Sequence, residues 1–301
     1  MSMKQEILHE LCAQGVRVCE NEALSAHTSF RVGGPAVWMA FPKDAEQLAL
    51  LLRLCRREGL SPRILGAGTN VLAPDEGIPQ PVVCTKNALT GCEALPGGRI
   101  AVMAGESLAR AAVFACEHGL SGLEFAHGIP GTLGGGVFMN AGAYGGEMKQ
   151  VVESVDCLSL DGAAHRFDAG QAQFGYRTSL FSSGQYVIVR AVLKLSPADE
   201  SLIRARMREL HERRRASQPL DRPSAGSTFK RPQGYYAGAL IEQAGLKGRG
   251  VGRACVSEKH AGFVVNLGGA TAKDVLETVR MVQAEVQRNS GVLLEPEIRI
   301  W

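Results

Sequence analysis

The sequence lacks the features that identify several classes of protein. Its eight cysteines form no C-x-x-C pair, which argues against a zinc site and against a disulfide framework. No apolar run approaches the roughly 20 residues that span a bilayer. Charge of one sign is not in excess, since the formal net charge is only +3 over 301 residues. We therefore expect reduced core thiols, no metal, no membrane insertion and no nucleic-acid partner.

The order of helical and strand patterns predicts an α+β protein in three lobes, at residues 1–82, 83–200 and 201–301. Helix patterns and strand patterns alternate in the first lobe, and strands dominate the second. Strands are expected at 36–42, 62–68, 99–105, 151–160, 165–169, 185–195 and 262–267. Helices are expected at the N-terminus, at 44–59 and 107–118, from 202, and from 271.

The last of these helices has the clearest signal. Thr271 is a capping residue with Asp274 three positions later, and valines follow at helical spacing. These apolar positions are Val275, Val279, Val282 and Val286. The pattern predicts a capped amphipathic helix with a valine face toward the core.

The sequence has 36 glycines, and twelve of them form clusters at 31–34, 66–70 and 128–146. Glycine lets backbone amides approach a pyrophosphate without interference from a β-carbon. A Rossmann fingerprint is absent, because GAGTN is followed by VLAPDEG and not by a third glycine that opens a long helix. A single loop of this kind is as readily a structural turn, but three together favour a bound dinucleotide held by another fold.

Six motifs, in their order and spacing, closely resemble the UDP-N-acetylenolpyruvoylglucosamine reductase family. They are LGAGTNVLAPDEG (65–77), EFAHGIPGTLGGGVFMNAGAYGGE (124–147), FGYRTSLF (174–181), PSAGSTFKRP (223–232), LIEQAGLKG (240–248) and LEPEIRI (294–300). The resemblance runs from about residue 25 to the C-terminus. The segment 177–219 is too short for the inserted tyrosine-bearing loop of the longer form, so the chain resembles the shorter form.

The resemblance implies a vanillyl-alcohol-oxidase-type (PCMH-type) FAD-binding fold with a C-terminal α/β substrate-binding lobe. It also implies NADPH-dependent reduction of UDP-N-acetylglucosamine enolpyruvate to UDP-N-acetylmuramate in peptidoglycan precursor synthesis. FAD would be bound noncovalently, and NADPH and the UDP-sugar would use one pocket in turn. We expect a cytoplasmic monomer.

The glycine-rich segments would hold FAD. The residues that match are Arg31, Gly33, Gly66, Ala67, Gly68, Thr69, Asn70, Val71, Gly128, Ile129, Gly131, Thr132 and Gly134. Thr69 stands where the family more often has serine, and it keeps the hydroxyl. His127, just before the second loop, is a residue type that can attach flavin covalently, but the family binds FAD noncovalently.

Three residues match the catalytic positions of the family. Ser227 matches the proton donor, although an isolated serine of this kind is more often a turn or capping residue. Arg177 matches the catalytic arginine, whose planar guanidinium suits a carboxylate. Glu297 matches the catalytic glutamate, and the neighbouring Glu295 is the alternative.

The resemblance also implies substrate contacts. Tyr176, Lys230, Lys247 and His260 match substrate-binding positions, with solvated lysines and a structural histidine as the alternatives. The family usually has a lysine where this chain has Ser217, so one phosphate contact is in doubt. An arginine at 213, 214 or 215 could replace it.

Two other functions remain open from the sequence. A protein of the same fold could oxidise an alcohol or hydroxy acid, and a third possibility is an inactive regulator that binds a UDP-sugar or flavin. The oxidase function leaves Ser227 and Lys247 without a role. The joint presence of Arg177, Ser227 and Glu297 argues against an inactive regulator.

Overall fold

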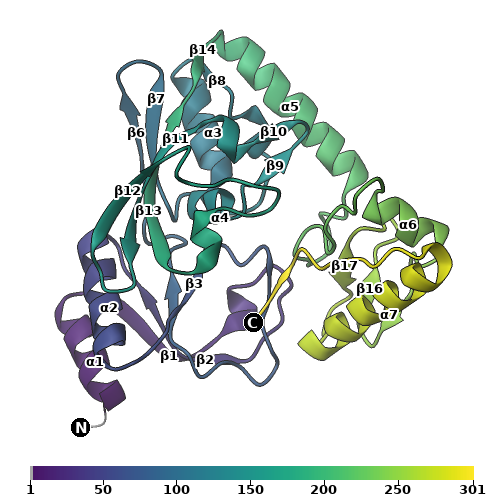
Figure 1. Cartoon of the computed structure of the whole chain (residues 1–301), viewed down its shortest axis with the longest axis horizontal. Helices are drawn as coiled ribbons and strands as arrows, with labels where there is room; N and C mark the ends of the chain where they lie inside the picture. The colour runs from purple at the N-terminus through teal and green to yellow at the C-terminus, as the bar shows by residue number, and fades with distance from the viewer. Residues whose placement is uncertain (1–2) are drawn as a thin grey trace. The chain divides into compact units, whose positions relative to one another are not determined.

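The structure is a computed structural model, and it describes residues 3–301, with side chains from Gln5 onward. The chain divides into two compact units, each assembled from separate stretches (Figure 1). The first unit comprises the chain up to Glu20, then Trp38–Ala67 and Gln80–Arg213. The second comprises Asn21–Val37, Gly68–Pro79 and Arg214–Trp301. The expected division into three lobes at 82 and 200 stays a prediction.

A five-stranded antiparallel sheet is the largest element of the first unit, with strand order β12-β11-β13-β7-β6. Its strands are β6 (Cys92–Leu95), β7 (Arg99–Met103), β11 (Val152–Ser159), β12 (Ala164–Asp168) and β13 (Tyr186–Lys194). β13 consists largely of buried valine, isoleucine, leucine and alanine, and β11 buries two valines and a leucine; such apolar side chains pack well on a pleated surface. The predicted strands at 99–105, 151–160, 165–169 and 185–195 are thus confirmed.

A second, four-stranded sheet has the order β1-β2-β5-β3, in which β5 pairs parallel with both β2 and β3. Its strands are β1 (Arg17–Ala23), β2 (Pro35–Phe41), β3 (Arg63–Leu65) and β5 (Val82–Cys84). The connection from β2 to β3 is helix α2 (Ala45–Arg57), capped by Asp44, whose carboxylate accepts a hydrogen bond from the Gln47 amide at 2.8 Å. The strand, helix, strand order is the predicted one.

The remaining elements of the first unit surround these sheets. They are α1 (Met3–Ala13), α3 (Leu108–Glu117), α4 (Leu133–Phe138), α5 (Glu200–Ser217, which ends beyond Arg213), β8 (Leu120–Ser121), β9 (Gly142–Ala143), β10 (Gly146–Glu147) and β14 (Ser196–Pro197). α1 packs against α2, and α4 packs against β13 and β7. Helix α4 brings the glycine-rich segment against the sheet.

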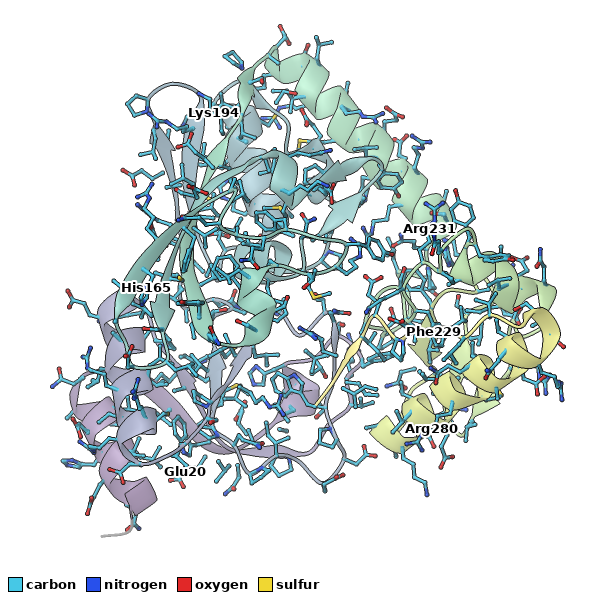
Figure 2. All side chains as sticks on the ribbon, viewed as in Figure 1. Glu20, His165, Lys194, Phe229, Arg231 and Arg280 are labelled. Carbon is cyan, nitrogen blue, oxygen red and sulfur yellow. The ribbon has the colours of Figure 1, made fainter. Side chains whose placement is uncertain are left out.

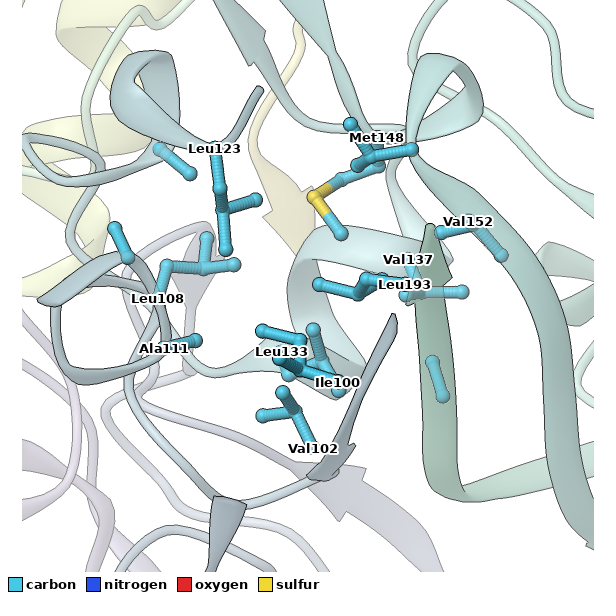
Figure 3. Close-up of a cluster of buried hydrophobic side chains, with 14 of the residues drawn as sticks. Ile100, Val102, Leu108, Ala111, Leu123, Leu133, Val137, Met148, Val152 and Leu193 are labelled. Carbon is cyan, nitrogen blue, oxygen red and sulfur yellow. The ribbon is translucent and has the colours of Figure 1, made fainter. Parts of the chain in front are cut away.

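One hydrophobic cluster lies under this segment (Figure 3). Leu133 and Val137 of α4 are fully buried beside Ile100 and Val102 of β7 and Leu108 of α3. Burial of side chains of this size stabilises the fold by roughly 1.5–3 kcal/mol each. A helix of only six residues is therefore held by packing and not by its own propensity.

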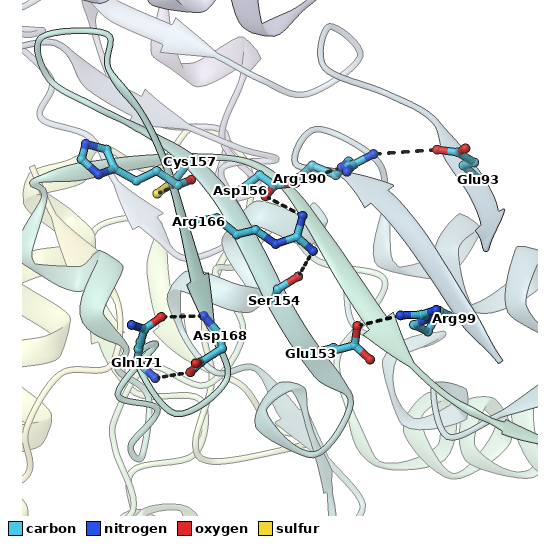
Figure 4. Close-up of polar contacts among 11 residues, drawn as sticks. Glu93, Arg99, Glu153, Ser154, Asp156, Cys157, Arg166, Asp168, Gln171 and Arg190 are labelled. Carbon is cyan, nitrogen blue, oxygen red and sulfur yellow. Dashed lines mark hydrogen bonds and ion pairs between the residues drawn. The ribbon is translucent and has the colours of Figure 1, made fainter. Parts of the chain in front are cut away.

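Polar side chains cover part of the large sheet (Figure 4). Arg190 Nε lies 3.1 Å from a carboxylate oxygen of Asp156, and Arg166 donates to the Ser154 hydroxyl at 2.8 Å. These groups are partly exposed, and such pairs contribute only about 0–1 kcal/mol each. These contacts are typical of a solvent-exposed sheet surface and do not indicate a functional site.

The second unit is built on a three-stranded antiparallel sheet covered by a long helix. The elements are β15 (Gly250–Val251), β16 (Ala254–Val256), β17 (Val264–Asn266), α6 (Ala237–Gln243), α7 (Ala272–Ser290), β4 (Val71–Leu72) and β18 (Arg299–Ile300). α7 packs against all three strands of the sheet, and β18 pairs parallel with β4. The pairing of β18 ties the C-terminal segment to the first glycine loop.

Helix α7 matches its prediction in detail. Thr271 Oγ1 accepts a hydrogen bond from the Asp274 amide at 3.0 Å, and Asp274 Oδ2 accepts one from the Thr271 amide at 3.1 Å. The four valines of the predicted face are at most 1% exposed. The capping box and the valine face are both confirmed.

The cysteines are free thiols, and four of them are buried, namely Cys55, Cys84, Cys116 and Cys157. Burial raises the pKa of Cys55 to about 12 and that of Cys92 to about 11. The prediction that cysteines lie in the core is confirmed for the four buried residues. Within residues 3–301, no helix combines the length and the apolar character needed to cross a bilayer.

Candidate functional site

The first unit brings two of the glycine clusters into contact. The loop after β3 contains Gly66, and a β-carbon placed there would lie 2.5 Å from the Thr132 hydroxyl oxygen. Thr132 is buried and caps α4, where its hydroxyl accepts a hydrogen bond from the Gly135 amide at 3.3 Å. Only glycine at position 66 permits this approach, since a real β-carbon does not come so near.

The segment that precedes α4 is itself held by backbone hydrogen bonds. The Leu108 amide donates to the Gly131 carbonyl at 3.0 Å, and the Gly134 amide donates to the Ala104 carbonyl at 2.8 Å. Gly131 has φ +155°, and a β-carbon at Gly134 would meet the Ala104 side chain at 3.0 Å. The loop is therefore a built structure that needs glycine at these points.

The second unit contains the rest of the first glycine loop, again at close quarters. A β-carbon at Gly68 would lie 2.1 Å from the His27 carbonyl oxygen, and the Ser29 amide donates to the Gly68 carbonyl at 3.1 Å. Gly33 has φ +117°, and a β-carbon there would lie 2.6 Å from the Ala73 side chain. The segments 27–33 and 68–73 are thus packed backbone to backbone.

Most of the residues predicted to bind the cofactor are accessible to solvent in their own unit. In the first unit, Gly66, Ala67, Gly128, Ile129, Gly131 and Gly134 are all partly exposed. In the second, Thr69, Asn70 and Val71 are also partly exposed, and Arg31, exposed at φ +57°, ends the 27–31 turn. Peptide groups that reach solvent from a rigid loop are the groups that bind phosphate and flavin oxygens.

His127 lies beside the second loop. Its ring centroid is 6.1 Å from that of His211 on α5, and burial lowers its pKa, with a further contribution from His211. A lowered pKa keeps the ring neutral.

Arg177 lies in a tight turn of the first unit. The Gly175 amide donates to the Thr178 carbonyl at 3.0 Å, and Arg177 itself has φ +55°. Both terminal nitrogens of its guanidinium lie 3.5 Å from the Gly142 carbonyl oxygen. The guanidinium carbon is also 5.4 Å from the centre of the exposed Tyr176 ring, so the two predicted residues are neighbours.

Ser227 and Glu297 lie on two segments of the second unit that pair backbone to backbone. The Glu297 amide donates to the Thr228 carbonyl at 2.8 Å, and the Lys230 amide donates to the Glu295 carbonyl at 2.8 Å. Phe229, labelled in Figure 2, is buried between these two hydrogen bonds. The structure therefore brings the predicted serine and glutamate close together along paired chains, although they are far apart in the sequence.

Lys230 and Lys247 each contact a carboxylate. Lys230 Nζ lies 3.1 Å from Glu295, and Lys247 forms an ion pair with Glu242. His260 lies near this second pair, and its Nδ1 accepts a hydrogen bond from the Gly262 amide at 3.1 Å. Burial lowers the pKa of His260, and the charge of Lys247 adds to the shift. These contacts leave the predicted substrate roles untested.

Two buried polar residues that hold the segments of Ser227 and Arg177 were not identified from the sequence. Thr228, fully buried, accepts a hydrogen bond from the Val264 amide at 2.9 Å, and so holds the segment that contains Ser227. Asn140, 1% exposed, donates to the Gly175 carbonyl at 3.0 Å, in the turn of Arg177. A polar residue enclosed by apolar or glycine neighbours was the available signal for both.

Comparison with known proteins agrees with this geometry. A family model described as FAD binding domain matches residues 37–168, and one described as UDP-N-acetylenolpyruvoylglucosamine reductase, C-terminal domain, matches residues 218–301. UDP-N-acetylenolpyruvoylglucosamine reductase 2 of Symbiobacterium thermophilum is 45% identical over 301 residues, which are 100% of this chain and 97% of that protein.

Solved structures are similar as well. The crystal structure of UDP-N-acetylenolpyruvylglucosamine reductase from Thermus caldophilus has a TM-score of 0.82 at 40% identity, over 95% of this chain and 99% of that one. BBE-like 1 of Physcomitrella patens has a TM-score of 0.51 at 13% identity, over 65% of this chain and 45% of that one, a likeness of fold alone.

The predicted α+β flavoprotein fold of the vanillyl-alcohol-oxidase type and the predicted cofactor FAD are confirmed. Relatives match this chain at 40% identity or more over nearly its whole length. The chain therefore belongs to the UDP-N-acetylenolpyruvoylglucosamine reductase family and is an FAD-dependent oxidoreductase.

Proposed function

We propose that the chain reduces UDP-N-acetylglucosamine enolpyruvate to UDP-N-acetylmuramate with NADPH as the reductant. Membership of the family supports the reaction. The backbone hydrogen bond between Thr228 and Glu297 supports the assignment of this reaction to particular residues. It fixes Ser227 and Glu297 on neighbouring segments. The product is a precursor of peptidoglycan.

Reduction of the enolpyruvyl group adds a hydride to its terminal carbon and a proton to the adjacent carbon. FAD would supply the hydride after its own reduction by NADPH. The second loop would hold the FAD, together with Gly66, Gly68, Thr69, Asn70 and Val71. The further residues proposed for this role are Arg31, Gly33, Ala67, Gly128, Ile129, Gly131, Thr132 and Gly134. Their closely packed backbones, described above, support this assignment.

Ser227 would donate the proton. A hydroxyl is a weak acid, but a carbon that carries developing negative charge is a strong enough base to take its proton. Gly226, with φ +74°, precedes the serine, and Thr228 follows it, fully buried. These neighbours give the serine a backbone position that the rest of the unit determines, which is what a general acid requires.

Arg177 and Glu297 would stabilise the charge that builds on the substrate carboxylate. A guanidinium offers two parallel N–H donors to a carboxylate and stays charged at neutral pH. Glu297 would stabilise the intermediate or tune the serine, and the hydrogen bond from its amide to the carbonyl of Thr228, the residue after Ser227, supports this role.

Tyr176, Lys230, Lys247 and His260 would contact the UDP-sugar. Both lysines carry ammonium groups suited to a diphosphate. NADPH and the sugar nucleotide would use one pocket in turn, a scheme supported by the absence of a second dinucleotide fingerprint in the sequence. The eight free thiols support a reducing compartment, and we propose the cytoplasm.

Stopped-flow measurement of the two half-reactions tests the proposal. Ser227→Ala should leave reduction of the flavin by NADPH unchanged and slow its reoxidation by UDP-N-acetylglucosamine enolpyruvate by roughly 10²–10⁴-fold, the usual contribution of a general acid. Ser224→Ala, in the same segment, is the matched control and should change neither rate. Equal slowing of both half-reactions would remove Ser227 from its proposed role.

The alternative function, oxidation of an alcohol or hydroxy acid, has its own signature. Such an enzyme would consume oxygen rapidly with those substrates and would not be reoxidised by the enolpyruvyl sugar. An inactive regulator would show neither reaction. Flavin reoxidation by the enolpyruvyl sugar, measured together with oxygen consumption, thus separates the three functions.

A further inference from the structure

Asn140 is a buried polar residue at the end of the glycine-rich segment. It lies two residues after the end of α4, it is 1% exposed, and its φ of +43° lies in the left-handed region that asparagine tolerates better than most residues. A buried amide must satisfy its donors and acceptor within the protein. The partners of Asn140 therefore show what holds it there.

Its side chain makes three hydrogen bonds. Nδ2 donates to Glu147 Oε2 at 2.8 Å and to the Gly175 carbonyl at 3.0 Å, and Oδ1 accepts from the Lys149 amide at 2.9 Å. One amide group thus joins three stretches of the first unit: the end of α4, the segment that follows β10, and the turn at 175–178.

That turn contains Arg177. Gly175 and Thr178 close it by hydrogen bonds between their backbones, at 3.0 and 3.4 Å, and Arg177 lies between them with φ +55°. Asn140 is bonded to the carbonyl at the first position of the turn. A change in that bond would move the backbone from which the guanidinium extends.

The guanidinium is held from the same direction. Both of its terminal nitrogens lie 3.5 Å from the Gly142 carbonyl, two residues after Asn140. Gly142 belongs to the hairpin of β9 and β10, where a β-carbon would lie 2.7 Å from the Gly146 carbonyl oxygen. Glu147, the partner of Asn140, lies on the other strand of this hairpin.

We propose that Asn140 is a positioning residue for Arg177, through which it sets the rate of the step that consumes the enolpyruvyl substrate. The inference rests on the proposed role of Arg177. It assigns the Asn140 amide two simultaneous tasks, to fix the turn backbone through Gly175 and to fix the hairpin through Glu147. Arg177 is bonded to both elements, so its two anchors share one side chain.

Asparagine suits these tasks for a chemical reason. The Glu147 carboxylate and the Gly175 carbonyl both need a donor, and one primary amide nitrogen carries two. Aspartate has the same shape but no donor, and it would place a carboxylate against two acceptors. Glycine keeps the left-handed backbone and removes all three side-chain bonds.

The experiment compares Asn140→Gly and Asn140→Asp with the wild type, each saturated with FAD. Asn140→Gly should slow reoxidation by the enolpyruvyl sugar about 10- to 100-fold, because an error near 1 Å in a binding group costs about this much. Reduction by NADPH should stay within about threefold of the wild type. Asn140→Asp should slow reoxidation at least as much.

Asn87→Gly is the matched control. Asn87 is also left-handed, with φ +59°, and is exposed in the first unit, so its replacement tests the effect of a glycine at such a position alone. It should leave both half-reactions unchanged. If Asn140→Gly also leaves reoxidation unchanged, or slows both half-reactions equally, the inference is wrong.

A double-mutant cycle with Arg177→Ala separates this inference from the proposed function. If Asn140 acts through Arg177, adding Asn140→Gly to Arg177→Ala should slow reoxidation no further. A multiplicative loss would overturn the inference. If Arg177→Ala alone leaves reoxidation intact, the role proposed for Arg177 fails, whatever the result at Asn140.

Discussion

Gly66 and Thr132 lie in contact, although one follows β3 and the other precedes α4. A β-carbon on Gly66 would lie 2.5 Å from the hydroxyl oxygen of Thr132, and that hydroxyl caps α4. Parts of two of the three glycine clusters therefore pack against each other within the first unit. The rigidity of this contact depends on the absence of a side chain at position 66.

Gly66→Ala should weaken FAD binding. The methyl group would displace the Thr132 hydroxyl, a change that typically costs about 1–3 kcal/mol when a packed site must shift. We expect a protein that loses FAD on dilution and denatures at lower urea. Flavin fluorescence during titration of the apoprotein measures the affinity.

Gly170→Ala is the control for this prediction. Gly170 is exposed on the turn after β12, and its nearest neighbour would be the end of the Asp168 side chain at 3.3 Å. If the two alanine variants bind FAD alike, close packing at position 66 does not matter for the cofactor.

Thr228→Val should destabilise the second unit. The Val264 amide donates to the Thr228 hydroxyl at 2.9 Å in a fully buried place, and valine would leave that amide without an acceptor. The expected loss is about 1–3 kcal/mol of unfolding free energy, measured by urea denaturation. Thr228→Ser keeps the hydroxyl and should cost less, about 0.8 kcal/mol for the lost methyl group.

The same pair of variants tests the link to catalysis. The Thr228 carbonyl accepts from the Glu297 amide, so a shift of this segment should slow reoxidation of the flavin more in the valine variant than in the serine variant. Identical reoxidation rates in the valine and serine variants would show that the Thr228 hydroxyl does not position Ser227 and Glu297.

Asp75→Ala should loosen the start of α7. One carboxylate oxygen of Asp75 accepts from the Ala272 amide at 2.7 Å and the other from the Lys273 amide at 3.0 Å. A carboxylate at a helix N-terminus satisfies free amides and opposes the helix dipole. We expect a loss of about 1–2 kcal/mol in urea denaturation, with a smaller loss for Asp75→Asn.

Glu76→Ala is the control at the next position, where the side chain is exposed. It should change the unfolding free energy by less than about 0.5 kcal/mol. Equal effects at 75 and 76 would mean that the two hydrogen bonds of the Asp75 carboxylate add no specific stability to α7.

The stability of the protein should fall in mild acid because of His260. Burial lowers its pKa, and its Nδ1 must be unprotonated to accept from the Gly262 amide. The unfolded chain binds the proton near pH 6.5, while the folded chain binds it only at lower pH. Unfolding therefore takes up a proton in this window, and stability declines as pH falls through about 6.5.

His260→Asn tests this pH dependence, since its side-chain oxygen can replace Nδ1 as an acceptor and does not titrate. Urea denaturation between pH 7.5 and 5.5 should show a smaller decline in the variant than in the wild type, about one proton less in the slope. Parallel curves would exclude His260 as the source.

Local chemistry was enough to predict most of the long helices and strands. The capping box at Thr271 and the valine spacing of α7 depend on residues within a few positions of one another, so the sequence contains the whole signal. Many short strands were missed, and among the missed elements β1 and α4 show the opposite reason most clearly. β1 is largely exposed and polar, and α4 contains three glycines, so neither has a local preference that reveals it.

The family motifs located the candidate residues but not their partners. The sequence by itself determined that glycine stands at 66 and 68, and that Ser227, Arg177 and Glu297 are present in matching motifs. Tertiary structure decided that Gly66 touches Thr132, that Thr228 pairs with Glu297, and that Asn140 bonds the turn of Arg177. Contacts between distant segments depend on the packing of the whole chain, and a local pattern contains no record of them.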